Sequence, residues 1–383
     1  MKICLVSGEY PPQQGGVGDY TRELGAALRR QGADACVLTG GAACPEDAVS
    51  PVPVERRLAG WGWRLWGDLD RALRDLAPDI VHIQYQAAAY RLHPAINLWP
   101  RFRGRRQRVV VTFHDLRVPY LFPKAGPLRP LSVLELARSA ARAIVTNVED
   151  QAALHGRLPT PAALIPIGSN IHPTPPPHYD RAAWRAQAGV GEGEIVLAYF
   201  GFLNESKGGE ELVQAAAALR AQGVPARLWL IGGQVGDVDP TNREYLARVR
   251  AQISRLGLEP WVRWTGFMSP GEVSATLLAA DLIVLPYRDG VSFRRGSLMA
   301  ALVHGLPVVS TQPRLPIPEI VEGENMALVP PGDAAALAGR LAVLAAEPEQ
   351  RRRLGAGALK LAALFNWDAI AACTIEVYEA LLR

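Results

Sequence analysis

The chain has 383 residues, which exceeds one ordinary hydrophobic core and suits two domains. Hydrophobic residues form 49% of the sequence and charged residues 20%, a composition that is typical of globular proteins and excludes a disordered chain. The net charge is only +4, so charge alone does not indicate nucleic-acid binding, and we expect no nucleic-acid partner.

The first half of the chain alternates short apolar runs with amphipathic helices. Helices are predicted over residues 19–30, which end before Gly32, and over residues 65–76, which end before Pro78. Short strands separated by helices predict a parallel, doubly wound sheet. The predicted strands span residues 3–6, 35–39, 80–84, 109–113, 143–147 and 163–167.

The alternation of predicted strands and helices resumes after a proline-rich segment. Residues 172–179 read HPTPPPHY, which suits neither a helix nor an inner strand, so we predict a linker over residues 172–180. The elements predicted after it are strands 195–200, 227–231, 262–265, 282–285 and 308–310, and helices 210–222, 243–256 and 297–303.

These elements predict an α/β protein with two doubly wound parallel-sheet, Rossmann-like domains that face a cleft. The first domain is expected to cover residues 1–171 and the second residues 181–366. A last helix, within residues 367–383, has no strand after it and is expected to cross back onto the first domain.

The cysteines and the hydropathy pattern indicate the compartment. Cys4, Cys36, Cys44 and Cys373 form no CxxC pair, and three of them stand in apolar runs, so neither a disulfide framework nor a zinc site is expected. No uninterrupted apolar stretch approaches the roughly 18 residues of a membrane span. We therefore expect a cytoplasmic protein.

A glycine-rich loop follows the first predicted strand. Gly15, Gly16 and Gly18 stand just before a helix, and the N–H groups of a helix N-terminus favour phosphate or another anion. The second strand ends at Thr39 and Gly40, without an acidic residue for a ribose diol, which disfavours NAD. The loop is either an anion site or a plain glycine-rich turn.

A lysine stands in the turn after strand 195–200. The sequence has only four lysines, and Lys207 lies beside Gly208 and Gly209 in GFLNESKGG, just before a helix. Open α/β sheets bind ligands at the carboxyl ends of their strands, so this turn is expected to neutralise a diphosphate. The alternative is a solvated turn lysine.

Two adjacent arginines stand at a later helix start. Arg294 and Arg295 lie in DGVSFRRGS, residues 289–297, and are placed for an anion. The alternative is a surface helix that Ser297 caps, with solvated arginines.

Taken together, these segments resemble the retaining glycosyltransferases of the GT-B fold. The family contains bacterial mannosyl- and glucosyltransferases and sucrose synthases, and is known as the glycosyltransferase group 1 type. The resemblance extends over nearly the whole chain, in family order. Its segments are GGVGDYTREL, VHIQYQ, VVVTFHDL, AIVTNVEDQ, YFGFLNESKG, VRWTGFMSPGEVSATLLAADLIVLPY, AALVHGLPVVST and IPEIVEGENMALVPPGD.

The resemblance implies roles in the second domain, but the donor site departs from the family pattern. Lys207 matches the lysine that grips the donor diphosphate, whereas the arginine position holds Phe202. The two glutamate positions hold Ser292 and Ala300. We expect Arg294 or Arg295 to replace the missing charge. Ser292 and the backbone N–H groups of residues 290–293, which include Gly290 and Phe293, are expected to hold the sugar.

The resemblance also implies roles in the first domain. His114 matches a histidine that faces the donor sugar, and the neighbouring Asp115 either fixes its tautomer or caps the next turn. His82 is interpreted as a core histidine of its strand. The expected catalytic residues are His114, Lys207 and Arg294. The other expected donor-binding residues are Gly16, Gly18, Asn204, Phe267, Gly290, Ser292, Phe293, Arg295 and Glu319.

No metal ion is expected, because helix termini and Lys207 offset the diphosphate charge without one. Two DxD strings occur, at residues 68–70 and 237–239. The first shares a helix with Arg71 and Arg74 and is interpreted as solvated, while the second is harder to dismiss.

An arginine-rich segment, residues 101–108, follows Trp99 and contains Phe102. This composition suits an anionic membrane surface, a lipid-linked or phosphorylated acceptor, or RNA. The alternative is a solvated basic connector.

We therefore expect a retaining hexosyltransferase that moves a sugar from a UDP-, GDP- or ADP-sugar to a hydroxyl acceptor, without a cofactor. The acceptor is a small molecule, a glycan or a lipid-linked molecule, and peripheral contact with the inner membrane face is one interpretation. Two alternatives stay open: a catalytically silent nucleotide- or glycan-binding relative, and a nucleotide-sugar 2-epimerase.

Overall fold

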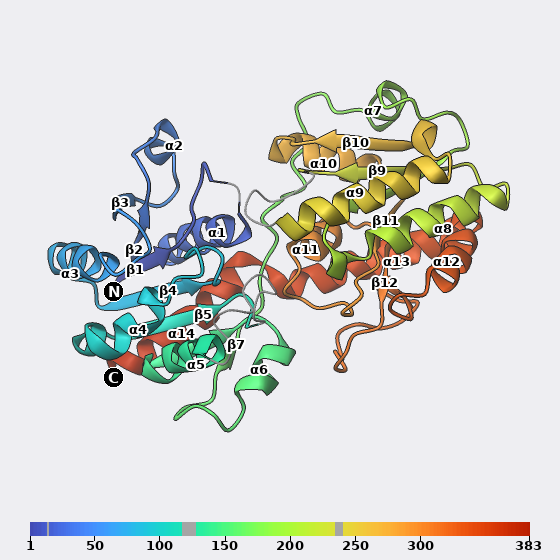
Figure 1. The fold of residues 1–383 in the computed structure, drawn as a ribbon. Coiled ribbons are helices and arrows are strands. Elements are labelled where there is room, and N and C mark those ends of the chain that lie inside the picture. The colour runs from blue at the N-terminus through green and yellow to red at the C-terminus, as the bar shows by residue number, and fades with distance from the viewer. Residues whose placement is uncertain (14, 117–127, 234–239) are drawn as a thin grey trace. The chain divides into compact units, whose positions relative to one another are not determined.

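The computed structural model describes residues 1–13, 15–116, 128–233 and 240–383 (Figure 1). The chain forms two compact units. Met1–Asn170 and Phe365–Arg383 make up the first, and Ile171–Leu364 the second. Each unit contains one parallel sheet with helices between its strands, which confirms the predicted α/β, doubly wound class.

The sheet of the first unit has seven strands in the order β3-β2-β1-β4-β5-β6-β7. Every strand pair in it is parallel. The strands are β1 (Lys2–Ser7), β2 (Asp34–Gly40), β3 (Val54–Leu58), β4 (Ile80–Tyr85), β5 (Val109–Phe113), β6 (Arg142–Val145) and β7 (Ala163–Leu164). The helices are α1 (Gly16–Arg30), α2 (Pro45–Ala48), α3 (Leu65–Leu76), α4 (Ala95–Phe102), α5 (Leu128–Ser139), α6 (Val148–Leu154) and α14 (Trp367–Leu382).

Both faces of this sheet are buried, as alternation along a strand requires. On β1, Cys4 and Val6 pack with residues of α3, α4 and α5, whereas Ile3 and Leu5 pack with residues of α1 and α14. The fold therefore contains two apolar layers, one on each side of the sheet.

The last helix packs into the first unit (Figure 1). Trp367 donates from Nε1 to the Ser169 carbonyl at 2.8 Å, and Arg30 pairs with Asp368 at 2.7 Å. The stretch Pro348–Leu382, which contains α14, is long and apolar enough to cross a membrane by length and composition, and 44% of its apolar window is buried. Within α14, Ile370 and Tyr378 belong to the core of the unit, as in a core helix of a globular domain.

The sheet of the second unit has six parallel strands in the order β10-β9-β8-β11-β12-β13. Residues 172–180 contain neither helix nor strand. The strands are β8 (Ile195–Phe200), β9 (Ala226–Ile231), β10 (Val262–Gly266), β11 (Leu282–Leu285), β12 (Val308–Thr311) and β13 (Ala327–Val329). The helices are α7 (Arg181–Gln187), α8 (Gly209–Ala221), α9 (Pro240–Arg255), α10 (Pro270–Ala279), α11 (Gly296–Val303), α12 (Ala334–Ala346) and α13 (Pro348–Ala362).

Candidate functional site

The second unit has a topological switch point between β8 and β11. The chain continues from β8 towards β9 and β10 on one side, and from β11 towards β12 and β13 on the other. Because β8 and β11 are parallel neighbours, the turn after β8 and the loop after β11 meet at the same edge of the sheet. Open α/β sheets bind ligands in this crevice.

The turn after β8 is built around two glycines. It ends in a short 3-10 helix, Glu205–Lys207, and then in Gly208 at φ 69°. A Cβ atom on Gly208 would lie 1.9 Å from the Pro286 carbonyl oxygen, so this close approach to the loop after β11 requires glycine. The Lys207 Nζ atom lies 3.2 Å from the place where a Cβ on Gly201 would stand, so the lysine reaches back over the end of β8.

Lys207 is a partly buried cation. The pKa of Lys207 is lowered to about 7, mainly by burial and also by the positive charge of Arg295, while the carboxylate of Asp289 offsets part of this shift. Among the residues that the structure describes, no carboxylate forms a salt bridge with Lys207. An amine that has no salt bridge to a described carboxylate and lies near a second cation is suited to bind a multiply charged anion.

The loop after β11 brings both arginines to one carboxylate. Arg294 Nη2 lies 3.0 Å from Asp289 Oδ2, and Arg295 Nη2 lies 2.5 Å from the same oxygen. The Arg294 side chain is only 4% exposed, whereas that of Arg295 is 15% exposed and stacks 4.8 Å from the centre of the Tyr287 ring. Arg294 is therefore buried to hold Asp289, and Arg295 is the arginine whose charge reaches Lys207.

The sugar-binding role expected of residues 290–293 does not match the geometry of this loop. The Gly290 N–H donates to the Tyr287 carbonyl and the Val291 N–H to the Thr311 carbonyl, both at 3.2 Å. Ser292 and Phe293 are buried, with 2% and 9% exposure. Two of the four expected donors are thus used within the fold, and the Ser292 side chain packs inside the loop.

The alternative interpretation of the arginine segment had Ser297 as the cap of α11, but Ser297 does not cap this helix. The helix begins at Gly296 with Arg295 in the N-cap position, and the Ser297 hydroxyl instead bonds the Tyr287 hydroxyl at 2.8 Å. This bond fixes the ring on which Arg295 stacks.

The remaining predicted residues of this unit lie in loops. Asn204 accepts a hydrogen bond from the Ser206 hydroxyl at 2.8 Å. Phe202, at the family's arginine position, packs against Gly233, where a Cβ would lie 2.8 Å from the ring. Phe267 follows the carboxyl end of β10 and is 71% exposed. Glu319 is exposed in a turn between β12 and β13 and begins no helix.

In the first unit, the glycine-rich loop is occupied by a carboxylate of the chain itself. The N–H groups of Val17 and Gly18 donate to Glu9 Oε1, at 2.9 and 3.4 Å. A Cβ on Gly15 would lie 2.2 Å from that carboxyl group, and a Cβ on Gly18 would lie 3.0 Å from Tyr10. We expected an external anion at Gly16 and Gly18, but the Gly18 N–H, together with that of Val17, already donates to Glu9. A carboxylate preceding a glycine-rich helix start is the signal that sequence reasoning missed.

His114 follows the carboxyl end of β5, as predicted. Its Nε2 atom lies 3.0 Å from Gln84 Oε1, and its ring packs edge-on against Tyr20 at 4.5 Å between centres. Burial lowers the pKa of His114 to about 3, so its imidazole is neutral at neutral pH. Gln84, which sequence reasoning did not single out, positions this ring from the neighbouring strand β4.

His82 is a buried core histidine, which confirms its interpretation. Its Nδ1 bonds the Tyr378 hydroxyl at 2.5 Å and its Nε2 the Thr112 hydroxyl at 2.7 Å. Burial, and to a lesser degree the electrostatic influence of a protonated His114, lowers the pKa of His82 to about 3. The histidine thus ties α14 to the centre of the sheet.

The first DxD string is not solvated as expected. Asp70 accepts from Trp99 Nε1 at 3.1 Å and pairs with Arg103, and Asp68 accepts the Ala59 N–H at 3.1 Å. The second string, at residues 237–239, lies outside the described residues. Within the described part of the chain, no group of three or more His, Cys, Asp or Glu side chains is placed to hold a metal ion.

Comparison with known proteins identifies two family domains. A model described as Glycosyl transferase 4-like domain matches residues 15–168, and one described as Glycosyl transferases group 1 matches residues 180–361. The phosphatidyl-myo-inositol mannosyltransferase of Mycobacterium leprae is 26% identical over 98% of this chain and 95% of its own length.

Solved structures with the same fold are also similar. The sucrose-phosphate synthase of Thermosynechococcus elongatus is 23% identical, with a TM-score of 0.77 over 99% of this chain and 98% of its own. Alr3699/HepE of Anabaena, solved in complex with UDP-glucose, is 19% identical, with a TM-score of 0.80 over 99% and 100% of the two chains.

The first curated relatives are matched only in part. They include a D-inositol 3-phosphate glycosyltransferase of Streptomyces bingchenggensis, which is 27% identical over 64% of this chain. The chain spans 33 to 54% of the length of these first relatives. The two matched domains and the shared two-sheet fold together show that the chain belongs to the GT-B glycosyltransferases of the group 1 type.

Proposed function

We propose that the chain transfers a hexosyl unit from a nucleotide-diphosphate sugar to a hydroxyl acceptor with retention of configuration. The observation that carries this proposal is the Lys207 cation, which lies beside Arg295 at the switch point without a salt bridge to a described carboxylate. Cations in this position suit the diphosphate that leaves when the bond to the sugar C1 breaks.

The roles of the residues follow from their surroundings. Lys207 and Arg295 neutralise the charge that develops on the leaving diphosphate. The acceptor hydroxyl forms the new bond to C1 as the bond from C1 to the diphosphate oxygen breaks, and its proton passes to the leaving diphosphate. His114 is neutral, so it acts as a hydrogen-bonding group towards a sugar hydroxyl and not as a cationic acid. The UDP-glucose complex of the Anabaena protein supports UDP-sugars as the first donors to test.

Incubation with UDP-, GDP- and ADP-sugars, followed by measurement of nucleoside-diphosphate release and analysis of the sugar product, tests the proposal. We expect release with at least one donor, and its loss in Lys207→Ala. Lys360→Ala is the matched control, because Lys360 is an exposed lysine of α13 in the same unit. Saturable binding without turnover would instead indicate the silent binding relative, and an epimerised nucleotide sugar would indicate the 2-epimerase.

A contact with an anionic membrane is supported by exposed side chains of the first unit. Phe102 is 57% and Trp63 54% exposed, and the Trp66 ring lies between them, 6.0 and 5.4 Å from their centres. All five arginines of residues 101–108 are exposed, although Arg103 pairs with Asp70 and Arg101 with Glu135. Aromatic rings flanked by arginines suit the interface of an anionic lipid bilayer.

Sedimentation with phosphatidylglycerol vesicles tests this contact, with phosphatidylcholine vesicles as the neutral control. We expect binding to the anionic vesicles at low salt, and its reduction in the double variant Arg105→Gln/Arg106→Gln. Absence of binding at low salt would exclude the membrane contact and leave the segment as a solvated basic connector.

A further inference from the structure

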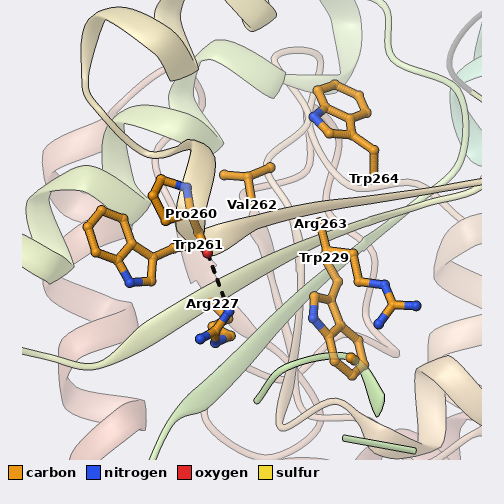
Figure 2. Close-up of a pocket in the computed structure, with 8 residues that line it drawn as sticks. Arg227, Trp229, Pro260, Trp261, Val262, Arg263 and Trp264 are labelled. Atoms are coloured by element: carbon orange, nitrogen blue, oxygen red, sulfur yellow. Dashed lines mark hydrogen bonds between the residues drawn. The ribbon is translucent and has the colours of Figure 1, made fainter. Parts of the chain in front are cut away.

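A pocket lies at the amino ends of β9 and β10 (Figure 2), whereas the turn that contains Lys207 follows the carboxyl end of β8. It is lined by the beginnings of β9 and β10, by the short 3-10 helix Glu259–Trp261 and by the end of α7. Its volume is about 370 Å³, within the range of small-molecule sites, roughly 300 to 1,000 Å³. β10 is the edge strand of the sheet, so no further strand of the described residues pairs with it on this side.

Two arginines flank a tryptophan on one face of the sheet. Arg227 and Trp229 are two residues apart on β9 and therefore project to the same face. Arg263 is the register partner of Trp229 on β10 and projects to that face as well. Figure 2 shows the Trp229 ring between the two arginine side chains.

The two arginines are held differently. Arg227 is ion-paired with Glu194 and donates to the Pro260 carbonyl at 3.4 Å, which fixes its guanidinium at the rim. Arg263 is exposed, and within the described part of the chain it has neither an ion pair nor a hydrogen bond from its side chain. Its planar fork of N–H groups is therefore available to a carboxylate or a phosphate.

The pocket wall also holds a polar group without a partner. Trp229 is only 1% exposed, and its indole Nε1 has no hydrogen-bond acceptor among the described residues. Buried indole N–H groups usually have a hydrogen-bond acceptor, so a buried N–H donor without one is unusual. A ligand hydroxyl that enters beside the ring would supply the acceptor.

Two further tryptophans line the pocket, Trp261 and Trp264, and each lies against an arginine outside the lining. The Arg220 guanidinium lies 3.5 Å from the centre of the Trp261 ring, and Arg250 lies 5.5 Å from that of Trp264. Glu194, the acid at this rim, is already engaged by Arg227. Indole faces pack against the C–H face of a sugar ring, and arginines bind its acidic substituent.

We propose that this pocket binds an anionic sugar, a pyranose ring that carries a carboxylate or a phosphate. The ring packs against one partly exposed indole of the lining, a ring hydroxyl accepts from Trp229 Nε1, and Arg263 binds the anionic group. The site is separate from the turn that contains Lys207, because it lies at the amino ends of the strands while the turn follows their carboxyl ends.

Isothermal titration with glucuronate and glucose 6-phosphate tests this assignment, with glucose and inorganic phosphate as comparison probes. We expect both anionic sugars to bind and to bind more tightly than either comparison probe. Arg263→Gln should weaken binding roughly tenfold, the loss of one charge-assisted bond. Arg255→Gln, an exposed arginine of α9, is the matched control and should change nothing.

A second variant and the donor site complete the test. Trp229→Phe removes the indole N–H and should also weaken binding of the anionic sugars. If this buried substitution does not fold, the variant of the exposed Arg263 still tests the site. Lys207→Ala should lose donor turnover and keep the anionic-sugar affinity, so a failure of the proposed function is distinguishable from a failure of this site. The proposal would be overturned if neither anionic sugar bound or if glucose bound equally well. It would also be overturned if Arg263→Gln left the affinity unchanged or if Lys207→Ala lost the binding.

Discussion

The depressed pKa of Lys207 makes donor binding depend on pH. With a pKa of about 7, the charged fraction of this amine falls from about nine-tenths at pH 6 to about one-tenth at pH 8. If the diphosphate binds the charged form, the Kd for a donor should rise about tenfold across this interval. UDP-glucose suits the measurement, because its diphosphate is esterified at both ends and keeps its charge over this range.

The assay is isothermal titration of UDP-glucose at pH 6, 7 and 8, in wild type and in Lys207→Met. The methionine retains the length of the side chain and removes its charge, so the variant should bind more weakly at pH 6 and lose most of the pH dependence. Lys360→Met should behave as wild type. A wild-type Kd that is constant from pH 6 to 8, or the same slope in Lys207→Met, would refute the assignment of this amine to the diphosphate.

The lowered pKa of Lys207 also affects stability: donor binding weakens as the pH rises, whereas the free energy of unfolding increases. Because the pKa of Lys207 in the folded state lies below its ordinary value of 10.5, the unfolded chain binds more protons between about pH 7 and 10.5. The free energy of unfolding of wild type should therefore rise with pH over this window, relative to that of Lys207→Met. Denaturant titrations of the two proteins at pH 7 and pH 9.5 measure this difference, and parallel changes would contradict it.

Three further substitutions give distinct outcomes. Arg295→Gln should raise the donor KM several-fold and also lower Tm, because its guanidinium pairs with Asp289. Arg294→Gln should mainly lower Tm, because its guanidinium is buried, so the donor KM from steady-state kinetics separates the two. Gly208→Ala should destabilise the second unit by at least about 2 kcal/mol, because the new methyl meets a carbonyl at positive φ; an unchanged denaturation midpoint would be inconsistent with the turn geometry. Tyr378→Phe removes a hydroxyl from buried His82 and should cost about 1 to 3 kcal/mol of unfolding free energy, measured in urea.

Periodicity alone predicts the central strands well. The expected strands at 109–113 and 195–200 have the same bounds as β5 and β8, because a strand buried on both faces is apolar throughout. Val54–Leu58 escapes prediction because it is an edge strand, β3, with the sequence VERRL, whose charged side chains remain partly exposed. The strand expected over 163–167 shortens to the two residues of β7 at the other edge.

Features of the candidate site that the sequence does not predict depend on contacts between residues far apart in the chain. The sequence predicts Lys207 and His114 at strand ends, because an apolar run ends there and a turn begins. It does not predict that Glu9 fills the start of α1, since that contact depends on how the loop between β1 and α1 folds back. Gln84 escapes attention for a similar reason: His114 directly follows the neighbouring strand β5, and only the register of β4 and β5 brings the two side chains together.

Arg295, next to the candidate diphosphate site, shows that a different loop of the same fold can supply a positive charge to one site. At the family's arginine position the turn after β8 has Phe202, and its ring packs against Gly233. A cation is nevertheless present at this edge, because the pairing of β8 with β11 brings the following loop, and with it Arg295, within electrostatic reach of Lys207. The fold fixes which loops meet at the switch point, and any of these loops can supply the charge. If this reasoning is right, Phe202→Arg should partly restore donor affinity in Arg295→Gln, and a double variant no better than Arg295→Gln alone would show that the two positions are not equivalent.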